Sequence, residues 1–499
     1  MTDPCNGSQN PGSRDPHGGP PPPPSPLETP APADTTCRMT ATALAKKTRA
    51  GDLGVVEIVA AHLARLRRLD PEINSVCTLD DQRAMDRARI LDQMTRGEGT
   101  PPLLGVPVLI CDLHHVEGMT TTRGSSLFAG VPAPAHDLHV ARLLEAGAVV
   151  LGKTNVPELG IGAHTHNRVS GATRNPRDTQ RTVGGASAAG AAAVACGFTP
   201  LADAIDLGGS MRAGGSFCGV VALTPSLGRV PSALRNDGWQ TLAQVGPIAR
   251  NVADAALMLS VMEGPDPRTP LSLEAPRLDP TTLDSEPSRW IAAKPESFGN
   301  LAPETGVTAA FDGALGKLAE LGVEIAERRI DLRGAGDVYK ILDAWRLSTR
   351  NAELLRRRRN DLDANLAWQI EQGLQLNGLV LAQAQAGRTR LLGRILKLLD
   401  TADVMVLPTT RVPPFSVRSP WAMELDAVRD TRLQVLGLSG LLSMLGLPVA
   451  TVPCGFTPDG LPVGLQVVGP PRADLTVLRF ARLVEQARGF EVEVLEPRR

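Results

Sequence analysis

The chain has 499 residues, of which 42% are hydrophobic and 21% charged, and its formal net charge at pH 7 is −1. The near-neutral charge argues against nucleic acid or an anionic membrane as the main partner. The sequence has no apolar run long enough to span a bilayer, and its first residues lack the basic start and apolar core of a secretory signal. The 7 cysteines form no CxxC pair, which favours a reducing, cytoplasmic compartment.

The first 37 residues differ in composition from the rest of the chain. Residues 1–37 are rich in Pro, Gly, Ser and Asp and contain an unbroken proline run at 20–24. Such a segment buries too little apolar surface to offset its ordering entropy, so we expect a disordered tail. A polyproline ligand for a partner module is the alternative, and a passive spacer is favoured. Residues 38–495 are predicted to form a single domain that begins with helices over 38–98.

Hydrophobic periodicity in this domain predicts alternating helices and strands. This alternation indicates an α/β fold, with a mixed β-sheet covered on both faces by helices. The expected helices lie at 54–69, 81–94, 139–146 and 474–487, and the expected strands at 103–111, 147–155, 447–456 and 460–469.

The stretch 264–440 carries no recognisable motif and is expected to be a variable, helical part of the domain. Residues 336–400 have a helical pattern with a run of arginines at 356–359. A charge run of this kind is typical of a solvated helix face. We expect this variable part to supply much of the wall of a pocket.

Two glycine-rich turns, at 184–190 and 206–210, flank a run of small residues. Glycine lets a backbone approach a reacting atom closely or adopt positive φ, so Ser210 at the end of the second turn is a candidate nucleophile. A serine hydroxyl is a weak nucleophile until a base takes its proton. The first turn offers Ala186 where a polar group would be expected.

A series of ordered motifs over about residues 40–490 resembles the amidase signature family of amide hydrolases. The motifs are GVPVLICDL (105–113), GKTNVPELG (152–160), GATRNPRD (171–178), the turn at 184–190, DLGGSMR (206–212), FCGVVALTPSLGRVP (217–231), GPIARNVADAALML (246–259), LPVATVPCGF (447–456) and GLPVGLQVVG (460–469). The resemblance implies the amidase-signature fold.

The same resemblance implies a Ser–cisSer–Lys triad, in which lysine is the base, a bridging serine relays the proton and a second serine attacks the carbonyl. The nucleophile falls on Ser210. Backbone N–H groups of the turn before it would stabilise the developing oxyanion, and this turn falls on Leu207, Gly208 and Gly209. Asp206 and Arg212 fall on positions that support the turn.

The two proton-handling positions of the implied triad have changed. The lysine falls on Cys111 and the bridging serine falls on Ala186. Alanine has no donor or acceptor, and a thiol with a pKa near ~8.5 does not replace an amine base. Losing the base of a serine triad lowers the rate on the order of 10⁶-fold. We therefore expect ordinary amidase turnover to be lost.

Two functions compete on this basis. The leading hypothesis is an amidase-like pseudoenzyme that binds a small amide, acid or ester, or serves as a scaffold. The alternative is an active hydrolase or acyltransferase that cleaves C–N amide or ester bonds through Ser210 or Cys111 with a substitute base. The N-terminal helices could support a homodimer or a protein partner.

Four residues are candidate substitutes in the proton relay. Ser187 follows Ala186, but one residue of chain shifts a side chain by ~3.8 Å and changes its direction. Asp112 follows Cys111 on a strand and should point to the opposite face as a hydrogen-bonded carboxylate. His164 and His166 are potential bases, although the sequence shows no partner that would orient them.

Cys111, His114, His115, His164 and His166 supply residue types that bind zinc. The spacing CxxHH matches no standard tetrahedral site, and strand alternation would send some of these side chains to opposite faces. We therefore predict no metal and no cofactor, with a packed thiol and surface imidazoles instead.

Two further residues in the motifs are interpreted as structural. Cys218 is expected to be a small buried residue. Lys153 matches a family position that is not used as the base.

Overall fold

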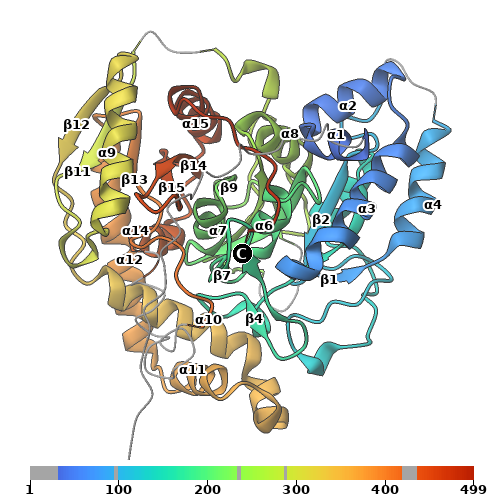
Figure 1. Ribbon diagram of the computed structural model, residues 1–499. Coiled ribbons are helices and arrows are strands. Elements are labelled where there is room, and N and C mark those ends of the chain that lie inside the picture. The colour runs from blue at the N-terminus through green and yellow to red at the C-terminus, as the bar shows by residue number, and fades with distance from the viewer. Residues whose placement is uncertain are drawn as a thin grey trace, which may run out of the picture.

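The fold is built on one large sheet, as the computed structural model shows for residues 32–94, 99–232, 238–285, 289–418, 435 and 437–498. Eleven strands pair in the order β1-β3-β2-β8-β10-β9-β14-β15-β13-β11-β12 (Figure 1). The strands are β1 (Val76–Leu79), β2 (Pro107–Cys111), β3 (Val149–Thr154), β8 (Leu201–Leu207), β9 (Val221–Thr224), β10 (Ala243–Ala249), β11 (Ile291–Pro295), β12 (Glu324–Arg328), β13 (Val404–Pro408), β14 (Val449–Phe456) and β15 (Pro462–Val468). Parallel and antiparallel pairs are mixed: β2 runs parallel to β3 and β8, whereas β8 and β10 are antiparallel.

Two short hairpins and a set of helices complete the described chain. The hairpins pair β4 (His166–Asn167) with β5 (Gly171–Ala172) and β6 (Arg174–Asn175) with β7 (Asp178–Thr182). The helices are α1 (Pro32–Arg38), α2 (Ala41–Ala50), α3 (Val55–Ile73), α4 (Asp81–Asp92), α5 (Leu138–Glu145), α6 (Ala189–Ala195), α7 (Ser210–Cys218), α8 (Val252–Met262), α9 (Thr305–Glu320), α10 (Ala335–Arg358), α11 (Ala364–Leu374), α12 (Gly378–Leu399), α14 (Leu438–Leu442) and α15 (Asp474–Ala487).

Helices cover both faces of the sheet, which confirms the predicted fold class. Side chains of a strand alternate between its two faces, and in β2 Val108 and Ile110 join a core with α2, α5 and α8. The intervening Leu109 joins a second core with α3, α4, α6 and α7. We call the first side the α5 face and the second the α6 face. Each face of β2 and β8 therefore has its own set of neighbours.

The N-terminal boundary predicted from composition is wrong by several residues. Helix α1 begins at Pro32, inside the segment expected to be disordered, and Cys37 is fully buried. Asp34 of this helix forms an ion pair with Arg65 of α3 at 2.7 Å. Packing on α3 orders the end of the segment despite its composition. The remainder of that prediction, residues 1–31, lies outside the described residues.

The part between 264 and 440 is helical only in part. Helices α9 to α12 fall in it, but so do β11, β12 and β13, which complete one edge of the main sheet. The arginines at 356–359 are exposed and pair with Glu353, Asp361 and Glu371, as expected of a solvated face. Every described helix is too short or too polar to cross a lipid bilayer.

Candidate active site

Ser210 stands where strand β8 turns sharply into helix α7. Gly208 and Gly209 adopt φ of 64° and 83°, a conformation that favours glycine. A Cβ at Gly209 would also lie 2.9 Å from the Cβ of Ser439, so larger residues are excluded there. The turn predicted from the sequence is thus formed. Ser210 is buried, and its hydroxyl donates a long 3.4 Å hydrogen bond to the carbonyl of Ile205.

A buried ion pair between Asp206 and Arg212 holds this turn in place. Arg212 donates from Nε to Asp206 at 2.9 Å, and both side chains are fully buried. Gln466 and the carbonyl of Ser439 accept the other guanidinium hydrogens at 2.7 and 2.9 Å, and Thr224 donates to the same carboxylate at 2.8 Å. Because every charged group has partners, the pair holds the turn without an uncompensated buried charge.

The position assigned to the lysine holds a thiol in a dry environment. Cys111 ends β2 with no solvent exposure, on the α6 face. Burial, with the nearby Asp203 carboxylate, raises the pKa of its thiol to about 12. At neutral pH this group is therefore uncharged, and it supplies neither an amine base nor a thiolate.

Ser187, rather than Ala186, places a hydroxyl beside this thiol. Ala186 is buried with φ of 28° and carries no polar side-chain atom. The Ser187 Oγ lies 3.4 Å from Cys111 Sγ and accepts the N–H of Ile205 at 3.3 Å. Within the described residues, no hydrogen bond joins Ser187 to Ser210. The hydroxyl reaches the lysine position but does not complete a relay to the nucleophile.

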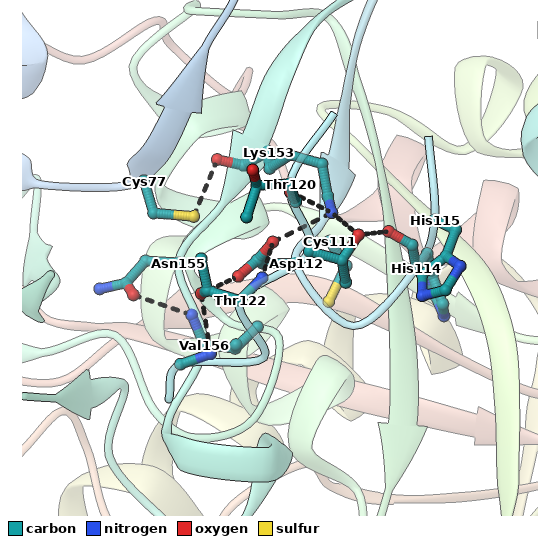
Figure 2. Close-up of polar contacts among 12 residues, drawn as sticks. Cys77, Cys111, Asp112, His114, His115, Thr120, Thr122, Lys153, Asn155 and Val156 are labelled. Carbon is teal, nitrogen blue, oxygen red and sulfur yellow. Dashed lines mark hydrogen bonds and ion pairs between the residues drawn. The ribbon is translucent and has the colours of Figure 1, made fainter. Parts of the chain in front are cut away.

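Asp112 and Lys153 neutralise each other. Figure 2 shows the carboxylate and the amine pointing toward one another, and their atoms are 3.0 Å apart in a buried ion pair. Thr121 accepts from the amine at 2.9 Å, and Thr122 donates to the carboxylate. The hydrogen-bonded role expected for Asp112 is confirmed. Among the described residues, neither group forms a hydrogen bond or ion pair with Ser210.

A second polar cluster lies on the α5 face of the same strands. Asp203 Oδ2 contacts His114 Nδ1 at 2.5 Å and His139 Nε2 at 2.8 Å, and the rings meet edge to face at 4.6 Å. The N–H of Cys111 donates to Asp203 Oδ1 at 2.6 Å. Burial alone would raise the pKa of Asp203, but the imidazoles lower it below its usual value. We call His114, His139 and Asp203 the imidazole cluster.

The expectation of surface imidazoles is wrong for His114 and His164, which are both only 6% exposed. His114 is drawn inward by the Asp203 carboxylate, and His164 bonds to Thr182 Oγ1 at 2.7 Å. The sequence contained one signal for the imidazole cluster. Asp203 interrupts an apolar strand at a position whose side chain must point into the α5-face core.

In the part of the chain that the structure describes, neither loop histidine forms a hydrogen bond with Ser210. His164 and His166 stack with ring centroids 6.1 Å apart and line a pocket next to Asp363. Burial lowers the pKa of His164 to about 4. Cys218 is buried, as expected.

A cavity of about 210 Å³ opens near the end of β8. Its lining includes Ile205 and Leu207 from the Ser210 turn, together with His114 and Arg123. Arg123 stacks on Phe128 at 5.0 Å, and burial lowers the pKa of its guanidinium. The cavity therefore borders the imidazole cluster through His114 and carries a cationic group in its wall.

The backbone of the cavity wall is held in an uncommon conformation. Arg123 and Leu159 both adopt φ of 52°, which costs of order 1 kcal/mol or more for residues other than glycine. The N–H of Leu159 donates to the carbonyl of Arg123 at 2.8 Å. The two strained residues thus stabilise each other.

Comparison with known proteins identifies relatives along most of the chain. The sequence matches the protein family described as Amidase over residues 57–478. An acylamidase from Rhodococcus erythropolis is 34% identical over 90% of this chain and 95% of its own length. A glutamyl-tRNA(Gln) amidotransferase subunit from Koribacter versatilis is 33% identical over 86% of this chain and 94% of its own length.

Two solved structures share the whole architecture. A 6-aminohexanoate cyclic dimer hydrolase in complex with its substrate has a TM-score of 0.84 at 26% identity, over 92% of this chain and 98% of that chain. A protein from a vestigial complex related to the evolutionary origins of an s-triazine catabolic enzyme has a TM-score of 0.81 at 28% identity, over 91% and 99%.

Proposed function

The chain belongs to the amidase family, and we propose that it is a ligand-binding member that has lost ordinary amide hydrolysis. The observation that carries the proposal is the buried, uncharged thiol of Cys111 where the family resemblance places the lysine base. Ala186 removes the bridging hydroxyl at the second position. The proton of Ser210 then has no route to a base.

The contacts of Ser210 support this proposal. Its hydroxyl bonds only to a backbone carbonyl, at 3.4 Å, among the described residues. A carbonyl oxygen accepts a hydrogen bond but does not remove a proton at neutral pH. Leu207, the first residue of the turn, lines the cavity, so the turn could offer an N–H group to a ligand oxygen without catalysing its attack.

The cavity wall favours a small ligand that carries a carboxylate. Arg123 lines the cavity with a half-buried guanidinium, and a planar guanidinium matches a carboxylate with two parallel hydrogen bonds. The volume of about 210 Å³ is below the range of about 300–1,000 Å³ common for drug-sized ligands. Short acids and amides of amino or keto acids fit these limits.

A fluorophosphonate probe tests the reactivity of Ser210. We expect no labelling of the purified full-length chain, while small carboxylate-bearing amides raise its melting temperature. Ser210→Ala should keep this thermal shift, whereas Arg123→Met should lose it. Labelling of the native chain that disappears in Ser210→Ala would show that a base activates the serine, and the proposal would then be wrong.

One observation favours the alternative, an esterase or acyltransferase acting through Ser210. The Ser187 hydroxyl lies 3.4 Å from Cys111 Sγ, so the site retains one hydroxyl beside the lysine position. An activated ester needs less help with its leaving group than an amide does. Turnover of a nitrophenyl ester that requires both Ser187 and Ser210 supports this alternative, and turnover that survives Ser210→Ala excludes it.

A protein partner or second copy is also part of the proposal. The relatives include an amidotransferase subunit, and a structural neighbour comes from a protein complex. Light scattering on the purified chain distinguishes a monomer from a dimer.

A further inference from the structure

We propose that His114, His139 and Asp203 form a binding site for a divalent transition-metal ion, with zinc as the expected occupant. The three side chains offer two imidazole nitrogens and one carboxylate oxygen, and these atoms all lie within 4.8 Å of one another. This set of ligands is typical of zinc and related ions in proteins. The inference does not depend on the reactivity of Ser210.

The distances allow an ion to enter with small movements. A zinc ion about 2.0–2.2 Å from each ligand atom would hold neighbouring ligand atoms ~3.4 Å apart in tetrahedral geometry. The Asp203 oxygen is now 2.5 and 2.8 Å from the two ring nitrogens. The side chains need to separate by less than about 1 Å, which side-chain rotation supplies without moving the strands.

The three ligands come from three packed elements, so their arrangement is built in advance. Asp203 belongs to β8, His139 to α5, and His114 follows the end of β2. Their side chains expose 0%, 4% and 8% of their surface, respectively. The N–H of Cys111 fixes Asp203 Oδ1, which leaves Oδ2 for the ion. Such outer contacts orient metal ligands in known sites.

Charge also favours a cation at this place. With both imidazoles neutral, as metal coordination requires, the three side chains carry a net charge of −1 in the protein interior. Among the described residues, no lysine or arginine forms an ion pair with Asp203. A buried carboxylate is costly unless it is paired or coordinates a metal, and a divalent ion supplies that partner. On binding, each ring proton that faces Oδ2 moves to the other ring nitrogen, which frees the coordinating lone pair.

The cavity indicates what else the ion would bind. His114 lines the cavity of about 210 Å³, together with Arg123. A zinc ion with three protein ligands keeps a position for water or for a ligand oxygen. A small carboxylate entering the cavity would therefore meet both the ion and the guanidinium. The same chemical class of ligand is favoured by both groups.

Metal titration of the full-length chain tests the site. After a chelator has stripped the chain and zinc has been added back, with the excess removed by dialysis, we expect about one zinc per chain by elemental analysis. Calorimetry on the stripped chain should give a dissociation constant below about 1 μM. Cobalt in place of zinc should give visible absorption bands of a tetrahedral site. His139→Gln should weaken zinc binding at least ~100-fold. The same change at an exposed histidine, His166→Gln, is the matched control and should have no effect.

Each outcome decides the proposal. Binding that is lost in His139→Gln and kept in His166→Gln supports it, provided that circular dichroism shows both variants folded. If His139→Gln does not fold, Asp203→Asn serves as the second variant. The cobalt spectrum of the native chain tests the site without any variant. No stoichiometric uptake of zinc, cobalt, manganese, iron(II) or nickel by the native chain overturns the proposal. Equal uptake by folded His139→Gln does so as well.

Discussion

The two faces of strands β2 and β8 carry polar clusters of opposite character. On the α6 face, the uncharged Cys111 thiol and Ser187 hydroxyl lie 3.4 Å apart, and the Ser210 hydroxyl makes a long contact of 3.4 Å to a backbone carbonyl. On the α5 face, Asp203 binds two imidazoles at 2.5 and 2.8 Å. The turn before Ser210 is thus held by the compensated ion pair of Asp206 and Arg212, while the carboxylate of Asp203 binds its imidazoles on the other side of the sheet. Membership of a family fixes the scaffold and leaves the chemistry to a few side chains.

Restoring the lost groups on the α6 face is the strongest test of this contrast. In Cys111→Lys combined with Ala186→Ser, we expect amide hydrolysis to rise at least ~10³-fold, because the base and relay together account for on the order of 10⁶ in rate. Hydrolysis of a simple carboxamide, followed by ammonia release, measures the gain. Adding Ser210→Ala should abolish it. A folded double variant without activity would mean that the two positions alone do not explain the loss.

Breaking the support of the turn is expected to affect stability rather than chemistry. Arg212→Met leaves the Asp206 carboxylate buried without its cation, and such changes cost about 3–5 kcal/mol. Urea denaturation measures the loss. The exposed pair of Arg329 and Glu296 is the matched control, since Arg329→Met should leave the unfolding free energy nearly unchanged. Equal effects of the two variants would contradict the role assigned to the buried pair.

A buried imidazole without a carboxylate partner should make stability depend on pH. Burial lowers the pKa of His164 from 6.5 to about 4, so the unfolded chain binds its proton first as pH falls. The stabilisation is complete above pH about 6.5 and is lost as pH falls toward 4, by about 2–3 kcal/mol. His164→Gln should flatten the curve of unfolding free energy in this window. An unchanged slope would show that the pKa of His164 does not differ between the folded and unfolded chain.

The smallest effect is expected at Ser187. Ser187→Ala removes one hydroxyl that accepts the N–H of Ile205, which costs about 1 kcal/mol. Thermal denaturation should detect this loss, and ligand-induced stabilisation should stay unchanged. A loss of ligand binding or of ester turnover would instead assign Ser187 to the working site. The contrast between the two faces would then need revision.

The sequence predicted elements best where a local pattern was sufficient. Helix α15 has the predicted bounds 474–487, and the pair Gly208–Gly209 correctly marked the turn before Ser210. Strand β12 was missed because its residues Glu324–Arg328 mix exposed charges with few apolar side chains at the sheet edge. Local composition does not reveal that such a segment pairs with β11.

The imidazole cluster was missed for a different reason. His139 and Asp203 are 64 residues apart in the chain and belong to a helix and a strand that meet only in the folded state. No spacing rule joins them to His114. The start of the ordered chain was misplaced likewise, since Asp34 is held by Arg65 of another helix. Contacts between distant elements determine both features.

The left-handed backbone conformation of Arg123 and Leu159 affects the entropy cost of ligand binding. A wall segment locked by its own hydrogen bond does not have to be organised by the incoming molecule, so little conformational entropy is lost on association. Binding would then depend on how well the ligand's shape matches a rigid cavity wall. Close analogues should differ mainly in their dissociation rate constants.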